Sequence, residues 1–364
     1  MWPTDGASAV LEIDLGAIVA NWRTLRERHL PGDVAAVVKA DAYGLGAAVV
    51  VPALHGAGCR HFFTAHLEEA IALRPLVPGA MLAVLNGLIP GTEPGYRAHA
   101  VTPVLGSLAE VALWRAEAER TGAPLEAILH IDTGMARLGL DEAEVAALTA
   151  DPHLLGGIRV RFVITHLVSA ECADDPLNER QRDRFATLAS RLPPAPCSIA
   201  NSSGIFLGPR FASDLARPGA ALYGVNPTPG RPNPMRPAVR LTARVLAIRT
   251  LGQGESVGYN ATWRAERPSR IATVGVGYAD GWPRSLSNRG AAFFDGRRLP
   301  LVGRVSMDLT TYDATDQGAL APGDWLELIG PAQPLAAVAE AAGTNEYEIL
   351  TALGGRYHRV VIGA

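Results

Sequence analysis

Lys39 is the first residue in the sequence whose chemistry stands out. It is the only lysine among 33 Lys and Arg residues, so arginine supplies every other permanent side-chain cation. An amine removed from water can lose its proton and attack a carbonyl, whereas a guanidinium stays charged in proteins. Lys39 also ends the apolar run VAAVVK, which is typical of a buried strand. These features predict Schiff-base chemistry at Lys39, and the alternative is a surface lysine without a role.

Other polar residues interrupt or follow further apolar runs in the same way. Each alone is weak, since a histidine there is more often structural and a serine can cap a helix. In a (β/α)₈ barrel, however, all strands end at one rim. An amine, a histidine, two arginines and small Gly/Ser segments at one rim would suit pyridoxal 5'-phosphate (PLP), with backbone N–H groups near Gly219 or the NSSG segment for its phosphate. The residues concerned are Arg137, His166, Asn201, Ser202 and Arg217.

The elements that must position these residues are eight apolar runs between about residues 10 and 225. They alternate with segments of helical spacing, a pattern that favours a (β/α)₈ barrel, with a doubly wound sheet as the alternative. Asp14 is the expected N-cap of the first helix. The expected strands are VAAVVK, HFFTA, MLAVLN, AVTPVL, LEAILHID, IRVRFVITH, CSIAN and GAALYGV, and the expected helices include 14–29, 107–122, 141–150 and 177–190.

A change of texture near residue 226 indicates a second domain. The segment NPTPGRPNPMRP is rich in proline and is typical of a linker. Short runs of strand character separated by Gly, Pro and Asp follow it. We therefore expect a barrel over residues 1–230, whose first residues pack with the second domain, and a mainly-β domain over residues 231–364.

Composition points to a small-molecule partner. A formal net charge of −3 gives no general attraction for nucleic acid or an anionic membrane. The three cysteines are scattered and contain no CxxC pair, so we expect neither a disulfide framework nor a metal site. The N-terminal residues lack the features of a secretion signal, and no apolar run is long enough to span a membrane. These observations predict a cytoplasmic protein.

Eight sequence blocks form an ordered set along the chain. They are AVVKADAYGLGA, HIDTGMARLGL, THLVSAE, ANSSG, RPGAALYG, VGYNATW, VGYADGW and VGRVSMDL. Together they resemble the blocks of the bacterial alanine racemases, over about residues 10–360. The resemblance implies an N-terminal (β/α)₈ barrel and a C-terminal β-domain, in a homodimer whose active sites take residues from both chains. It also implies an isomerase that interconverts L- and D-alanine and supplies D-alanine for the peptidoglycan of the cell wall.

The resemblance also implies roles for single residues. Lys39 would hold PLP as an aldimine and act as the base on one face of the substrate, while Tyr259 of the partner chain would be the base on the other face, with His166 beside it. Arg217 would face the pyridine nitrogen. The remaining matched positions are Tyr43, Asn201, Ser202 and Gly219 for the cofactor, Arg137 and Met307 for the substrate carboxylate, and Tyr278, Arg284, Arg304 and Asp308 around the substrate entrance.

Two positions depart from the family pattern. Many relatives have a carbamylated lysine where this chain has His130, so another group must orient Arg137. Some relatives close the pocket with a tyrosine where this chain has Gly355, and Tyr357 lies two residues further on as a candidate replacement.

The residues leave three alternatives open. One is an amino-acid racemase of broader specificity, which the glycine at 355 would allow. Another is a PLP-binding carrier without catalytic activity, although such a protein would need neither a β-domain nor Tyr259. The third is a barrel-type decarboxylase. Arg217 disfavours it, because a guanidinium gives no proton to the pyridine nitrogen and makes PLP a weaker electron sink.

Overall fold

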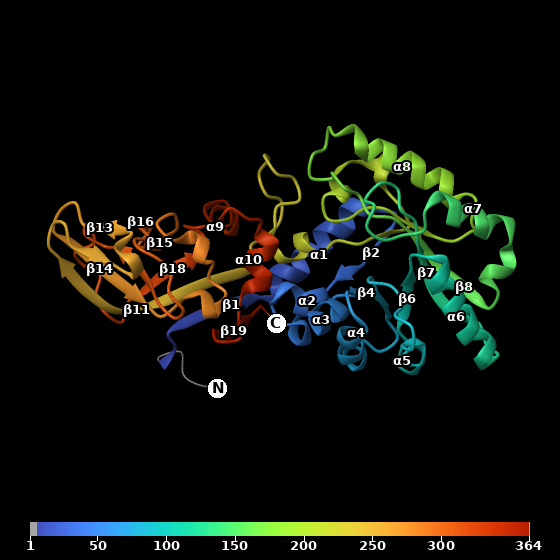
Figure 1. The fold of residues 1–364 in the computed structure, drawn as a ribbon, viewed down its shortest axis with the longest axis horizontal. Coiled ribbons are helices and arrows are strands. Elements are labelled where there is room, and N and C mark those ends of the chain that lie inside the picture. The colour runs from blue at the N-terminus through green and yellow to red at the C-terminus, as the bar shows by residue number, and fades with distance from the viewer. Residues whose placement is uncertain (1–5, 364) are drawn as a thin grey trace.

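The computed structural model describes residues 6–363, and it contains two parts that follow one another along the chain. The first is a barrel of parallel strands covered by helices, and the second is built mainly from antiparallel strands (Figure 1). The predicted barrel and β-domain are thus confirmed, and the doubly wound sheet is wrong.

The barrel strands run parallel and close on themselves. Seven of them form a sheet in the order β3-β4-β5-β6-β7-β8-β9, and β10 pairs with β2. The Arg217 backbone N–H donates to the Ala200 carbonyl at 2.8 Å and so joins the ends of β9 and β10. The strands are β2 (Asp33–Val34), β3 (Ala36–Val37), β4 (His61–Thr64), β5 (Met81–Val84), β6 (Thr102–Leu105), β7 (Leu125–His130), β8 (Ile158–Ile164), β9 (Cys197–Ser198) and β10 (Leu215–Ala216).

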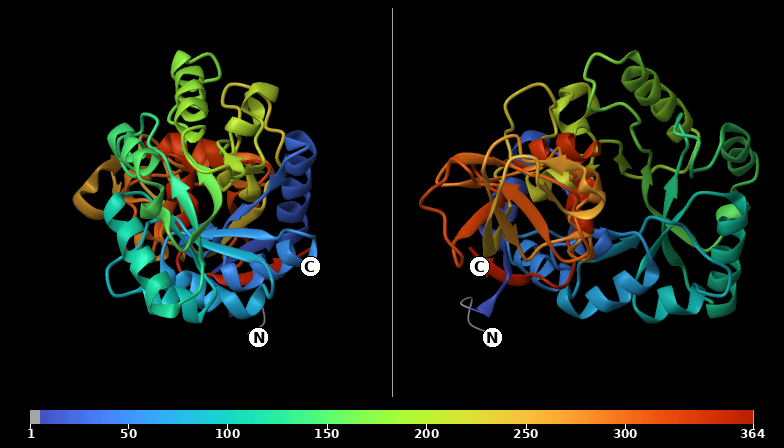
Figure 2. Two further views of the ribbon diagram at one scale, coloured as in Figure 1. Left: turned by 90° about the vertical axis from the view of Figure 1, so that its right-hand side faces the viewer. Right: turned by 60° about the vertical axis from the view of Figure 1, so that its left-hand side comes forward.

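Helices lie outside these strands, as the two turned views show (Figure 2). Alternate strand side chains point into the barrel, where Val37, Phe63, Val104 and Ile128 are buried together. The predicted N-cap is confirmed, because the Asp14 side chain accepts from the Ala17 N–H at 2.9 Å. The helices are α1 (Leu15–His29), α3 (Ala47–Gly56), α4 (Leu67–Leu73), α5 (Glu93–Ala98), α6 (Leu108–Thr121), α7 (Glu142–Ala150) and α8 (Pro176–Ala189).

The eighth expected strand is wrong. GAALYGV contains a buried 3₁₀ turn, Ala220–Tyr223, which packs against α1, and the strand that closes the barrel is the two-residue β10 just before it. A short apolar run bounded by glycines has the same signature as a buried helical turn, so its hydrophobicity alone could not distinguish the two.

The second part contains a mainly antiparallel sheet that includes a strand from the start of the chain. Its order is β16-β15-β18-β11-β1-β19, and β14 links β11 to β17. Strand β1 (Ala9–Asp14) pairs with both β11 and β19. The other strands are β11 (Val239–Leu251), β12 (Ser256–Val257), β13 (Trp263–Arg264), β14 (Ser269–Val274), β15 (Ala291–Phe294), β16 (Arg297–Pro300), β17 (Thr310–Asp313), β18 (Trp325–Ile329) and β19 (His358–Ile362).

Two short helices lie between β18 and β19 in the chain. Helix α9 (Leu335–Ala342) packs on α10 (Glu346–Ala352), and α10 in turn contacts the turn that follows Lys39. Figure 1 shows α10 between the barrel and the β-domain. The C-terminal part of the chain therefore reaches the rim of its own barrel.

Candidate active site

A cavity of about 780 Å³ opens at the C-terminal ends of the barrel strands. Its walls come from loops that follow β3, β7, β8, β9 and β10, as a barrel active site requires. Eight of the predicted site residues line it, so the strand ends converge as expected: Lys39, Tyr43, Arg137, His166, Asn201, Ser202, Arg217 and Gly219.

Lys39 starts an unusual turn. The next four residues, Ala40 to Tyr43 (α2, Lys39–Tyr43), all have positive φ, between 53° and 56°. A left-handed turn costs roughly 1–2 kcal/mol per residue for L-amino acids, so other contacts must hold it. Hydrogen bonds inside the turn join Ala42 N to Val38 O and Gly44 N to Ala40 O.

The carboxylate of Glu69 braces this turn from α4. One oxygen accepts from the Ala40 N–H at 2.6 Å, and the other accepts from the N–H groups of Ala65 and His66 at 2.8 and 3.1 Å. Since Ala40 directly follows Lys39, Glu69 fixes the backbone that aims the lysine into the cavity.

We expect Glu69→Ala to lower the free energy of unfolding by about 1–3 kcal/mol, because it removes a charged acceptor from three backbone donors. Urea unfolding followed by circular dichroism measures the change. Glu68→Ala on the exposed side of the same helix is the matched control. Equal losses in the two variants would contradict the bracing role.

The environment favours the neutral form of the Lys39 amine. Burial lowers its pKa below the ordinary value and the charge of Arg137 lowers it further, while Glu69 acts in the opposite direction. A lowered pKa gives a larger fraction of free amine, which is the form that reacts with a carbonyl.

One end of the cavity is built to hold an anion. The Ser202 hydroxyl oxygen accepts from the N–H groups of Gly219 and Ala221 at 3.1 and 3.2 Å, so its proton is left to donate. Burial raises the pKa of Tyr43 to about 12, which keeps this hydroxyl a donor as well. A Cβ at residue 219 would lie 2.2 Å from the Tyr43 hydroxyl, so only glycine fits there.

Arg217 supplies a buried cation. Its Nη1 donates to the Ser198 carbonyl at 2.9 Å, and its Nη2 contacts the Thr165 carbonyl. Burial lowers its pKa to about 10, so it stays charged at neutral pH. Within residues 6–363, no carboxylate pairs with it and no acceptor takes the hydrogen of its Nε. A neutral ring nitrogen in the cavity would be a suitable partner.

Two histidines beside Arg217 are held neutral. For His166, burial and then the charges of Arg217 and Arg137 lower the pKa to about 3. For His130, burial and then Arg217 lower the pKa to about 4, against a small opposing effect of Asp132. His130, which stands where many relatives have a carbamylated lysine, is therefore an uncharged imidazole and not an anion.

These shifts predict that the protein without its cofactor loses stability in acid. The unfolded chain binds protons at these histidines below about pH 6.5, whereas the folded chain does so only near pH 3–4, so stability falls as the pH drops through that window. We expect a loss of roughly 2–4 kcal/mol between pH 7.5 and pH 5 from urea unfolding, and a shallower dependence for His130→Asn. An unchanged slope in that variant would contradict the assignment.

Arg137 projects from a tightly tied loop. Asp132 accepts from the N–H groups of Gly134, Met135 and Ala136 at 2.9, 3.0 and 3.1 Å, which fixes the DTGMAR segment. No hydrogen bond or ion pair joins the Arg137 guanidinium to another side chain between residues 6 and 363. Packing of the loop, and not a neighbouring anion, thus positions Arg137 in this structure.

The predicted site residues that belong to the β-domain lie outside this cavity. Tyr259, Met307 and Tyr278 expose 69%, 53% and 43% of their surface. Tyr357 is buried among the β-domain residues and does not line the cavity of its own chain. Its hydroxyl has no hydrogen-bond partner within residues 6–363. Its role in place of the tyrosine absent at Gly355 stays a prediction.

Sequence reasoning gave no role to several residues that line the cavity, among them Asn86, Glu171 and Tyr347. Tyr347 comes from α10, stands edge-on to Tyr43 with ring centroids 6.5 Å apart, and donates to the Glu171 carboxylate at 2.6 Å. Asn86 could have been found, since it ends the run MLAVLN. Nothing in the sequence pattern connects Tyr347 to the barrel rim.

Together these groups fit PLP. The cavity offers one amine for its aldehyde, hydroxyl and glycine donors for its phosphate, and a buried guanidinium with a free N–H for its ring nitrogen. The fold and the site thus define a barrel enzyme of the PLP-dependent class.

Comparison with known proteins gives the family. Residues 13–227 match "Alanine racemase, N-terminal domain" and residues 238–361 match "Alanine racemase, C-terminal domain". The chain belongs to the alanine racemase family. An alanine racemase of Acidiphilium cryptum is 60% identical over 96% of this chain and 98% of its own length. A protein of Agrobacterium fabrum named "Alanine racemase, catabolic" is 50% identical over 98% of this chain and 93% of its own length.

Solved structures agree. The alanine racemase of Bartonella henselae, with covalently bound pyridoxal phosphate, is 44% identical, with a TM-score of 0.96 over 98% of this chain and all of that one. A biosynthetic alanine racemase of Pseudomonas aeruginosa is 36% identical, with a TM-score of 0.90 over 98% of this chain and 99% of that one.

Proposed function

We propose that this chain racemises alanine by a two-base mechanism in which Lys39 serves one face of the substrate and Tyr259 of a partner chain serves the other. Racemisation of alanine with PLP is the activity of the family to which the chain belongs. The observation that carries the mechanism is the single lysine, whose pKa burial lowers, in the wall of the cavity that holds the donors for PLP.

Bound PLP would supply an electron-withdrawing ring that acidifies the substrate α-hydrogen. Tyr43, Asn201, Ser202 and the Gly219 segment would hold the phosphate. Arg217 would donate from Nε to the ring nitrogen without protonating it. Because the ring nitrogen stays unprotonated, the ring would take up less negative charge. Return of a proton to the α-carbon would then be favoured over other reactions of PLP.

Racemisation needs a proton acceptor on one face of the α-carbon and a donor on the other. The neutral Lys39 Nζ can accept the proton on its own face. The Tyr259 hydroxyl would act on the opposite face, with His166 as hydrogen-bond acceptor; because His166 is neutral, its influence on Tyr259 would come from this bond and not from a positive charge. Arg137 and the Met307 N–H would hold the substrate carboxylate.

We propose a homodimer with shared sites. Tyr259, Tyr278 and Met307 are large side chains exposed on the β-domain, and none lines the cavity of its own chain. The turns that carry Tyr278 and Met307 adjoin one another, since the Tyr278 N–H donates to the Ser306 carbonyl at 3.0 Å. A second copy that places this surface over the cavity would complete the site.

The cellular role we propose is supply of D-alanine for peptidoglycan in the cytoplasm. Free Cys59, Cys172 and Cys197 suit a reducing compartment. Within residues 6–363, no helix has the length and apolar character needed to cross a bilayer. Because two relatives are named catabolic, a catabolic role is the second candidate. Restoring growth without added D-alanine to a host that cannot make it would support the first role.

Substrate breadth is tested by turnover. We expect alanine to be racemised much faster than serine or lysine, and comparable rates for all three would favour the broad-specificity alternative. PLP binding without any loss of optical activity would instead indicate the carrier.

A further inference from the structure

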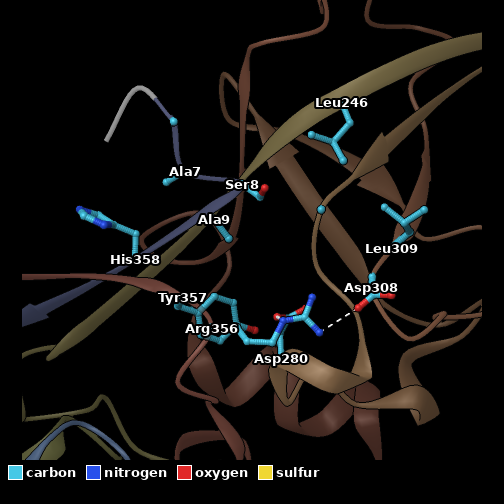
Figure 3. Close-up of a pocket in the computed structure, with 12 residues that line it drawn as sticks. Ala7, Ser8, Ala9, Leu246, Asp280, Asp308, Leu309, Arg356, Tyr357 and His358 are labelled. Carbon is cyan, nitrogen blue, oxygen red and sulfur yellow. Dashed lines mark hydrogen bonds and ion pairs between the residues drawn. The ribbon is translucent and has the colours of Figure 1, made fainter. Parts of the chain in front are cut away.

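A second pocket lies in the β-domain, bounded by the first described residues, the loop before β19 and the turns that carry Tyr278 and Met307 (Figure 3). Arg356 extends across it between two carboxylates. Its Nε lies 3.0 Å from Asp280 Oδ1, and its Nη1 donates to Asp308 Oδ1 at 2.8 Å. We call these three residues the arginine clamp.

Each aspartate of the clamp belongs to a turn that presents a proposed substrate residue. Asp280 ends the 3₁₀ turn Tyr278–Asp280, and its second oxygen accepts from the Gly277 N–H at 2.8 Å. Asp308 directly follows Met307. Arg356 therefore joins the turn of Tyr278 to the turn of Met307.

The two turns are also in direct backbone contact. The Ala279 N–H donates to the Met307 carbonyl at 2.9 Å. A Cβ at residue 277 would lie 2.3 Å from the same oxygen, so the backbones cannot shift independently. Any displacement of one turn is passed to the other.

The burial of Asp280 makes its ion pair with Arg356 important for stability. Only 4% of this residue is exposed, and Arg356 is the cation that pairs with it. A buried carboxylate is strongly destabilised when the cation paired with it is removed, so the turn that carries Asp280 must move. Since Arg356 does not line the barrel cavity, loss of its charge would reach the substrate only through the turns.

We propose that Arg356 is a positioning residue that acts in trans: through Asp280 and Asp308 it fixes Tyr278 and the Met307 N–H in the geometry that binds the substrate carboxylate in the partner's barrel. This inference rests on the proposed sharing of sites between two chains. It predicts that Arg356→Gln lowers kcat/KM roughly 10- to 100-fold, mostly through KM, because small misplacements of binding groups are costly.

Mixed dimers test the direction of this effect. Lys39→Ala and Arg356→Gln chains with different affinity tags are co-expressed, and the dimer carrying both tags is purified with PLP. In it, the barrel that keeps Lys39 faces a β-domain that keeps Arg356. We expect about half of the wild-type activity, with wild-type KM, since one of two equivalent sites is intact. A Lys39→Ala and Tyr259→Phe mixture is the matched control.

The outcomes separate the two proposals. If the Tyr259 mixture regains activity and the Arg356 mixture does not, Arg356 acts within its own chain or on folding, and the inference is overturned while the proposed function stands. If the Tyr259 mixture stays inactive, the shared sites are overturned and the clamp with them. Asp308→Asn, which changes an exposed residue, repeats the test where Arg356→Gln fails to fold, and the same recovery is expected.

Discussion

The Lys39→Ala variant racemises alanine at a rate lower than that of the wild type by a factor on the order of 10⁴ or more. The substitution removes a base and the covalent anchor of the cofactor together. The purified variant no longer retains PLP after treatment with borohydride, whereas the wild-type chain becomes irreversibly labelled. The rate of loss of optical rotation of L-alanine measures the activity, and mass spectrometry of the Lys39 peptide measures the label.

Lys39→Arg is the informative companion. It keeps a positive charge at the same position but cannot attack an aldehyde. We expect it to be as inactive as Lys39→Ala. Activity close to that of the wild type in the arginine variant would show that position 39 contributes charge alone, and the role assigned to the lone lysine would be wrong.

Tyr259→Phe is the second large effect. The variant keeps the ring but loses the hydroxyl proposed as the base on the second face, so we expect a fall in kcat of roughly 10²–10⁴-fold in both directions. PLP attachment to Lys39 stays intact, because Tyr259 is not part of the cavity of its own chain. Polarimetry with L- and D-alanine measures the rates.

Tyr312→Phe is the matched control for this change. Tyr312 lies in the same domain, is buried and does not line the cavity. Removing its hydroxyl should therefore leave the activity nearly unchanged. A similar loss of activity in the two phenylalanine variants would indicate a general effect on the β-domain and would contradict the catalytic role of Tyr259.

The sequence predicts many residues of the barrel rim, because a polar residue that ends an apolar run marks the end of a strand. Lys39 and His166 each end an apolar run, and parallel strands in a barrel bring such ends together whatever their separation along the chain. The domain change near residue 226 is likewise visible as a shift from helical to strand spacing. Hydrophobic period and polar interruption thus point to seven of the eight predicted residues that line the cavity, whereas Tyr43 follows from the family resemblance alone.

The rest depends on contacts that have no local signature. GAALYGV has the composition of a buried strand, and only its packing on α1 makes it a turn. Tyr347 lines the cavity because α10 lies between the two domains. Arg356 pairs with Asp280, which is far away in the sequence, and residue spacing does not predict such a contact. The left-handed turn after Lys39 is similarly hidden, since Ala40 and Ala42 are ordinary residues for a right-handed helix.

The most direct test of the two-base account is the fate of the α-hydrogen in early turnover. L-alanine is incubated in D₂O with the PLP-loaded protein, and the first D-alanine formed is analysed for deuterium at the α-carbon. If separate bases serve the two faces, the D-alanine carries solvent deuterium from the outset. D-alanine that retains the original hydrogen of its substrate would show that one group moves the proton across both faces, and would contradict the account.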